Sequence, residues 1–144
     1  MQTLTLELAN RIVTHALAAG RRSECAPLAV AVLDARGCLK AFGAEDGTSL
    51  LRGDIAAAKA AGALNMGFGG RTLARRAQQN PAFFDSLNAV SHGRMVAVRG
   101  SVLLRDAAGT LLGAVGISGD TSENDEACAV AGVQAAGLTA DAGE

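Results

Sequence analysis

The sequence predicts an α/β fold of the α+β kind, in which a single, mostly antiparallel sheet has helices packed on it. Four short apolar segments fall into two pairs, and a turn of a few residues joins the members of each pair, as in β-hairpins. The segments outside these pairs have apolar residues at helical spacing. The predicted order is therefore a helix, a hairpin, a helical region, a second hairpin and a last helix.

The first half of the chain contains two helices around the first hairpin. Residues 4–20 have a helical apolar stripe, and residues 50–66 read as an alanine-rich helix. Between them, residues 28–44 read as a hairpin whose first strand, 28–34, is apolar on both faces, so both sides should be covered. Gly62 lies in mid-helix, where it costs about 1 kcal/mol relative to alanine. We therefore expect another backbone to pass close to it.

The second half begins with two short helices, which are followed by the second hairpin. Residues 72–79 and 81–90 read as helices because a proline at position 81 disfavours a continuous helix. Residues 94–104 read as a strand that Gly100 interrupts, and residues 110–118 read as a buried strand. The two strands form the predicted second hairpin.

The last predicted element is a helix that runs from Ser122 to about Gly137. Ser122, with Asp125 three residues later, resembles a capping box in which aspartate replaces the usual glutamate or glutamine. Residues 138–144 are expected to form a frayed tail.

A glycine-rich segment precedes this helix, with glycines three residues apart at Gly113, Gly116 and Gly119. The spacing matches neither the dinucleotide nor the P-loop motif, and the acids at the helix entrance would repel a phosphate. The favoured interpretation is close packing, in which a helix or a neighbouring subunit presses on the strand. The alternative is a turn that lines a pocket, with Ser118 or a free N–H facing a ligand.

Length and composition favour one domain, residues 1–144, that assembles with copies of itself. The chain has 144 residues, of which 49% are hydrophobic and only 3% aromatic, with no Trp or Tyr. Such a core is thin and its backbones lie close together. Because subunit contacts stabilise thin cores, we expect a homo-oligomer.

Charge and hydropathy exclude several classes of partner. The net charge of −1 disfavours nucleic acid, because binding to phosphates needs a basic surface. No apolar run approaches the roughly 20 residues of a membrane span, and the N-terminus lacks the pattern of a signal peptide. The three cysteines have no CxxC spacing and no histidine at metal-ligand spacing, so no metal site is predicted. We expect a cytoplasmic protein that binds neither membranes nor nucleic acid.

Four stretches together resemble one known family, the GlcG/HbpS-like family of heme-degrading or heme-binding domains. They are LTLELANRI, AVAVLDARG, EDG followed by IAAAKAAGAL, and DAAGTLLGAVGISGDTSENDEACAVAG. The resemblance covers residues 4–138. It implies a small domain shaped like profilin or PAS domains, which forms oligomers. It also implies that some members bind heme or a corrinoid, while others are encoded beside glycolate and diol catabolic genes.

The resemblance also selects candidate site residues. The matching positions are Asp46, Lys59, Gly116, Ser118, Gly119, Asp125 and Glu126. Lys59 is interpreted either as a lysine that extends to solvent or as a pocket cation that pairs with Asp125, with Glu126 or with a ligand. Two segments expected to flank the pocket depart from the family pattern: the arginine usual before Asp46 is absent, and so is the proline usual near Gly100. A changed ligand is therefore plausible.

The first functional hypothesis is a small-ligand-binding module for heme or a related tetrapyrrole. Heme iron needs an axial ligand, and His92 is the best placed candidate, in a turn ahead of a predicted strand. Ser118 and Gly119 are predicted to bind the same cofactor. The other axial candidates are His15, the three cysteines, Met66 and Met95. The supply of four phenylalanines is thin for a heme pocket, which counts against heme.

The alternative hypothesis is a small catabolic enzyme of lyase, isomerase or hydratase type that acts on an acidic metabolite. Lys59, Asp125 and Glu126 would be its catalytic residues. Asp46 and Arg94 would bind the substrate, and Arg52 or Arg71 could equally hold a carboxylate. A third hypothesis is an accessory oligomer without chemistry.

Overall fold

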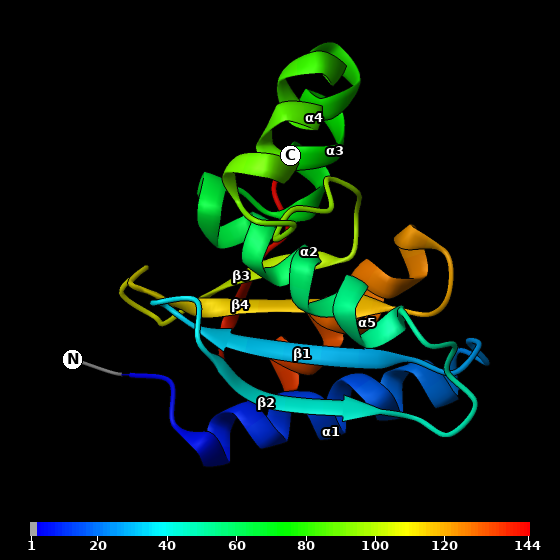
Figure 1. Ribbon diagram of the computed structural model, residues 1–144. Coiled ribbons are helices and arrows are strands. Elements are labelled where there is room, and N and C mark those ends of the chain that lie inside the picture. The colour runs from blue at the N-terminus through cyan, green and yellow to red at the C-terminus, as the bar shows by residue number, and fades with distance from the viewer. Residues whose placement is uncertain (1–2) are drawn as a thin grey trace.

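The structure is a computed structural model that describes residues 3–144, and it confirms the predicted fold class. Within these residues, five helices accompany one five-stranded antiparallel sheet (Figure 1). The elements are α1 (Leu6–Arg22), β1 (Ala29–Asp34), β2 (Leu39–Ala44), α2 (Arg52–Met66), α3 (Gly70–Gln79), α4 (Pro81–Val90), β3 (Ser101–Arg105), β4 (Leu111–Ser118), α5 (Ser122–Ala135) and β5 (Thr139–Asp141). None of the described helices has the length and apolar character needed to cross a bilayer.

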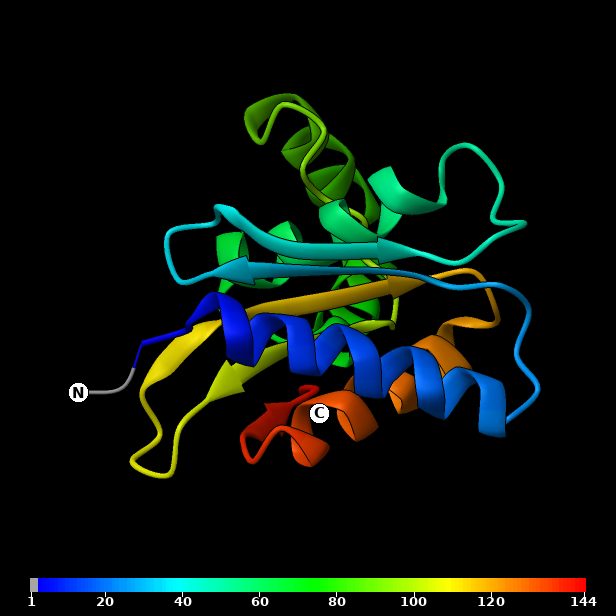
Figure 2. The ribbon, with the colours of Figure 1, turned by 90° about the horizontal axis from the view of Figure 1, so that it is seen from below.

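The sheet has the strand order β2-β1-β4-β3-β5, with every neighbouring pair antiparallel. Helices α1 and α5 pack side by side on one face, and α2 lies across the other face (Figures 1 and 2). The two central strands, β1 and β4, are therefore covered on both sides. This agrees with the prediction that residues 28–34 are apolar on both faces, since Ala29 to Leu33 are all buried.

Small residues let the helices approach the sheet closely, as the composition indicated. A Cβ atom at Gly116 of β4 would collide with the carbonyl oxygen of Ala56 in α2. Gly62 of α2 likewise lies beneath Met95, whose Sδ would be 3.0 Å from an added Cβ. The packing interpretation of the glycine-rich segment is therefore correct at Gly116, where a helix presses on the strand.

The predicted strand 94–104 is wrong over its first half. Only Ser101–Arg105 forms β3, and residues 94–100 make an irregular crossing over α2. Gly100 has a φ of +122°, which turns the chain at the point where it joins the sheet. Its carbonyl accepts a hydrogen bond of 2.9 Å from the Ile117 N–H, so the crossing is tied to β4 without continuing the strand.

The expectation of a frayed tail at residues 138–144 is also wrong. Residues 139–141 form β5, which pairs with β3, so the tail covers that edge of the sheet. The N-terminus of α3 has no side-chain cap, and the tail supplies acceptors and donors there. The Arg71 N–H donates to the Ala142 carbonyl at 3.0 Å, and the Glu144 N–H donates to Thr72 Oγ1 at 2.8 Å.

The capping residue of α5 is Thr121, which corrects the predicted cap at Ser122. Thr121 Oγ1 accepts a hydrogen bond of 3.2 Å from the Asn124 N–H. Asp125 takes no part in this cap because its carboxylate turns toward the interior, where it meets Lys59. The helix ends at Ala135, two residues short of the prediction, and Gly137 follows with a φ of +82°.

Candidate functional site

Lys59 and Asp125 form a buried ion pair between α2 and α5. Lys59 is only 3% exposed, and its Nζ donates to Asp125 Oδ2 at 3.2 Å and to the Ile117 carbonyl at 2.8 Å. The second oxygen of Asp125 accepts a hydrogen bond of 3.0 Å from the Asp120 N–H. The pairing expected between Lys59 and a carboxylate of the last helix is therefore present, and both charged groups have partners.

Burial dominates the electrostatics of this pair. It lowers the pKa of Lys59 and raises the pKa of Asp125, and the attraction between the two charges offsets each effect only in part. Gly100 closes the site from above, since a Cβ atom there would be 2.7 Å from Lys59 Nζ. Within residues 3–144, neither residue lines any of five surface hollows with volumes of about 170 to 510 Å³. This geometry favours a structural role, in which the ion pair holds α2 and α5 together; we call the pair a structural lock.

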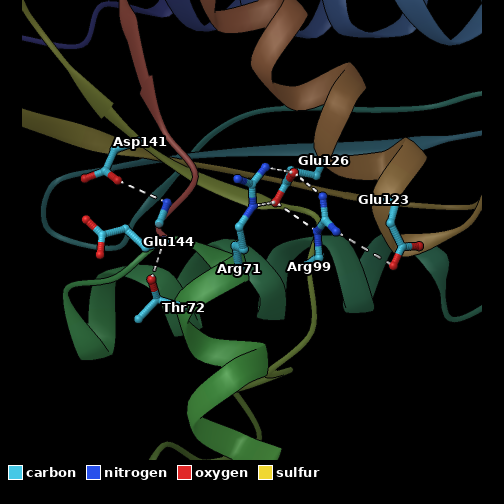
Figure 3. Close-up of polar contacts among 8 residues, drawn as sticks. Arg71, Thr72, Arg99, Glu123, Glu126, Asp141 and Glu144 are labelled. Carbon is cyan, nitrogen blue, oxygen red and sulfur yellow. Dashed lines mark hydrogen bonds and ion pairs between the residues drawn. The ribbon is translucent and has the colours of Figure 1, made fainter.

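Glu126 lies next to this pair in sequence, but it binds two arginines instead (Figure 3). Its carboxylate is 4% exposed and accepts hydrogen bonds from Arg71 Nη2 at 2.6 Å and from Arg99 Nη2 at 2.7 Å. Each arginine also directs its Nε at Oε1, at 3.4 and 3.2 Å. Arg99 Nη1 lies 3.9 Å from Glu123 Oε1 at the rim.

The cluster joins α5, α3 and the crossing segment before β3. Sequence reasoning proposed Arg71 as a clamp for a substrate carboxylate, and the structure shows it holding the protein's own Glu126. Arg99 was missed altogether. The sequence signal that could have indicated it is its position directly before Gly100, where the predicted strand is interrupted.

The Glu126 cluster predicts a defined pH dependence of stability. Burial alone would raise the pKa of Glu126, but hydrogen bonds from Arg99 and Arg71 hold it below the ordinary value of 4.5. A lowered carboxyl pKa contributes stability above pH 4.5 that disappears as the pH falls through the folded-state pKa. We expect Glu126→Gln to lower the free energy of unfolding by about 1–3 kcal/mol at pH 7 and by clearly less at pH 3.

Urea denaturation at the two pH values measures this difference. Glu123→Gln is the matched control, because the Glu123 side chain is 63% exposed and its contact with Arg99 is long. The control should lie near wild type at both pH values. An equal loss for Glu126→Gln at pH 7 and pH 3 would show that its charge is not the source of the stabilisation.

Ser118, Gly119 and Asp46 lie at one end of the sheet. Ser118 is buried at the end of β4, and its Oγ accepts a hydrogen bond of 3.3 Å from Arg52 Nη1. Gly119 follows with a φ of +150° and packs on the Pro27 carbonyl. Asp46 is exposed and lines an open hollow of about 460 Å³ with Arg21, Pro27, Ala44 and Glu45. The hollow therefore includes one of the predicted substrate-binding residues.

His92 and Arg94 lie elsewhere, in the turn that follows α4. His92 is exposed and has a φ of +56°, and the Arg94 Nε donates to the Ser91 carbonyl at 3.0 Å. Neither residue lines any of the same five hollows of residues 3–144. The predicted site residues thus fall into separate groups, and their roles in binding or catalysis stay predictions.

One hollow contains His15, which was among the other axial candidates predicted beside His92. It follows the outer face of α1 and has a volume of about 510 Å³. It is lined by Leu6, Glu7, Asn10, Arg11, Thr14 and His15. These residues are spaced as one face of a helix. His15 is exposed, and so is the side chain of Leu6. Among residues 3–144, no group of three or more His, Cys, Asp or Glu side chains could hold a metal ion.

These features define a small α+β protein whose antiparallel sheet is covered by helices on both faces. The model of a family described as "Haem degrading protein HbpS-like" matches residues 4–134. The chain therefore belongs to the HbpS-like family, as the sequence resemblance predicted. A comparison with the curated proteins finds no match.

Solved structures support the same fold. A PduOC–heme complex superposes with a TM-score of 0.85 at 22% identity, covering 99% of this chain and 100% of PduOC. Klebsiella pneumoniae ORFY gives a TM-score of 0.84 at 22% identity, with 95% and 92% covered. A double mutant of Streptomyces reticuli HbpS gives 0.79 at 26% identity, with 93% and 87% covered. Because the first two structures are only 22% identical to this chain, their similarity shows the fold alone.

Proposed function

We propose that this protein is a heme-binding domain in which heme lies against the outer face of α1 with His15 as an axial ligand. The main observation in support is the exposed His15 imidazole, which lines a hollow of about 510 Å³. Two comparisons support the choice of ligand: the family is described by haem degradation, and one similar structure is a heme complex of PduOC.

The chemistry of the α1 hollow fits heme. Heme iron takes an axial ligand such as histidine, cysteine, methionine or tyrosine, and His15 offers its imidazole at the surface. The exposed Leu6 provides apolar contact for the macrocycle. Arg11 provides a cation for a propionate. When bound, heme would supply an iron centre capable of one-electron chemistry.

His92 remains the second candidate for the axial ligand. It was the first choice on the sequence, because a turn ahead of a strand can present a side chain to a ligand. In its favour, it is exposed. Against it, His92 lines none of the five hollows in residues 3–144, so a macrocycle bound there would find few apolar contacts.

A hemin titration of the purified protein tests the proposal. We expect a sharp Soret band that saturates at one heme per chain. A weak, broad absorption change that does not saturate would mean that hemin adheres to apolar surface without a specific site. The proposal would then fail.

We also propose that the protein forms a homo-oligomer through the exposed edge of the sheet. Strand β2 lies at this edge, where Leu39 and Phe42 are exposed. Leu50 and Leu51 precede α2 and are 95% and 61% exposed. A shared interface would remove this apolar surface from water. Light scattering after size exclusion should give a multiple of 14.4 kDa, and a mass of one chain would contradict the proposal.

The catabolic-enzyme hypothesis stays a prediction that no specific observation favours. Its proposed base and acid, Lys59 and Asp125, bind each other in the interior. All three of its candidate arginines already have protein partners. Arg71 binds Glu126, Arg52 binds Ser118, and Arg94 donates to the Ser91 carbonyl. We therefore place heme binding first.

A further inference from the structure

Two of the three cysteines meet in the core although about 100 residues separate them along the chain. Cys25 lies in the connection between α1 and β1, and Cys128 lies in α5. Both side chains are buried in the same apolar cluster. Burial and, after it, the neighbouring Cys25 raise the pKa of the Cys128 thiol. The third cysteine, Cys38, is exposed in the turn between β1 and β2.

The backbone around Cys25 is fixed from several directions. Its N–H donates to the Gly20 carbonyl at 3.0 Å, and its carbonyl accepts a hydrogen bond of 2.6 Å from Arg21 Nη2. Its neighbour Ala26 donates its N–H to Asp120 Oδ1 at 2.8 Å. The connection that carries Cys25 is therefore held to α1 on one side and to the start of α5 on the other.

Gly20 brings the second sulfur into this arrangement. A Cβ atom at Gly20 would lie 3.8 Å from Cys128 Sγ. The same residue accepts the Cys25 N–H, so it contacts both cysteine-bearing segments. The packing of α1 on α5 and this fixed backbone therefore bring the two cysteine-bearing segments together at Gly20, inside one apolar cluster.

We propose that Cys25 and Cys128 are an oxidation site that forms an intramolecular disulfide when the protein meets a peroxide. One sulfur attacks the peroxide, the O–O bond breaks, and a sulfenic acid and one water form. The second thiol then attacks the sulfenic sulfur, the S–O bond breaks, and a second water leaves. Two thiols are oxidised and one hydrogen peroxide is reduced to two waters. This site is independent of the proposed heme function.

The two cysteines have different roles in this reaction. Burial and the neighbouring Cys25 raise the pKa of Cys128 to about 12, so Cys128 remains a thiol at neutral pH. Cys25 is therefore assigned the first attack and Cys128 the second. Because both sulfurs are buried and only the thiolate attacks, the small ionised fraction of Cys128 limits the second step. We therefore expect slow oxidation that accelerates as the pH rises.

The test uses the Cys38→Ser variant, which retains only the two core thiols. After hydrogen peroxide at pH 8, the protein is unfolded and treated with a thiol alkylator, and its mass is measured. We expect a monomer that takes up no alkylator and has lost two hydrogen atoms. Because the disulfide closes a loop of about 100 residues, the melting temperature should rise by roughly 5–10 °C.

The controls are two double variants, Cys38→Ser with Cys25→Ser and Cys38→Ser with Cys128→Ser. Two are used so that one control remains if the other folds poorly. Each retains a single core thiol and should show neither the loss of two hydrogen atoms nor the rise in melting temperature. The proposal is overturned if both thiols of Cys38→Ser stay open to alkylation after hours of oxidation. It is also overturned if the melting temperature rises equally in the controls.

Discussion

Asp125→Ala is expected to lower the free energy of unfolding by about 3–5 kcal/mol, the usual result of removing one partner from a buried ion pair. Lys59 is 3% exposed and would lose the carboxylate that lies 3.2 Å from its Nζ. Only the Ile117 carbonyl would remain as an acceptor for its ammonium group. The Asp120 N–H would also lose its partner, which frees the turn before α5. Urea denaturation followed by circular dichroism measures the loss.

A double variant separates the cost of an unpaired charge from the value of the pair. Lys59→Met with Asp125→Leu replaces both charges by apolar side chains of similar size, and such replacements are often neutral in stability. We expect it to recover most of the stability that Asp125→Ala loses. If Asp125→Ala proved as stable as the wild type, the pair would not be a structural lock, and a functional role for Lys59 would regain support.

His15→Ala is expected to weaken hemin binding by at least about 100-fold and to shift the Soret band. Changes in the outer shell of metal sites commonly cost 10–100-fold in affinity, and the loss of a direct ligand costs no less. Since His15 is exposed on α1, its removal should leave the fold intact. An unchanged melting temperature without heme checks this point.

His92→Ala is the matched control for that experiment. Like His15 it is an exposed histidine, but it lies in the turn after α4, outside the hollow on α1. Its substitution should leave the titration curve near wild type. In the opposite pattern, His92→Ala loses hemin binding and His15→Ala retains it. That result would identify His92 as the axial ligand and would show that the α1 hollow is not the site.

Local patterns were sufficient to predict most elements. The apolar stripe of α1 and the two-sided burial of β1 follow directly from periodicity. The tail at 138–144 could not be read in this way, because its strand depends on an open edge of β3 and on an uncapped α3. Neither condition appears in the tail's own residues. The break at 94–100 likewise depends on α2 and Glu126, which lie far away in sequence.

The candidate site shows the same limit. The partnership of Lys59 with a carboxylate of the last helix was expected, but only the structure selects Asp125 and gives Glu126 to Arg71 and Arg99. The hollow on α1 was missed because Leu6 reads as part of the apolar stripe of residues 4–20 and His15 as a packed or surface residue of the same helix. The placement of Cys25 and Cys128 in one apolar cluster was missed because no spacing rule relates residues so far apart.

The most direct test of the central claim is a crystal structure of the protein with hemin bound. We expect an iron–nitrogen bond to His15 and a macrocycle that lies against Leu6 on the outer face of α1. Iron bound to His92 or to a cysteine, or a macrocycle seated between α3 and α4, would contradict it.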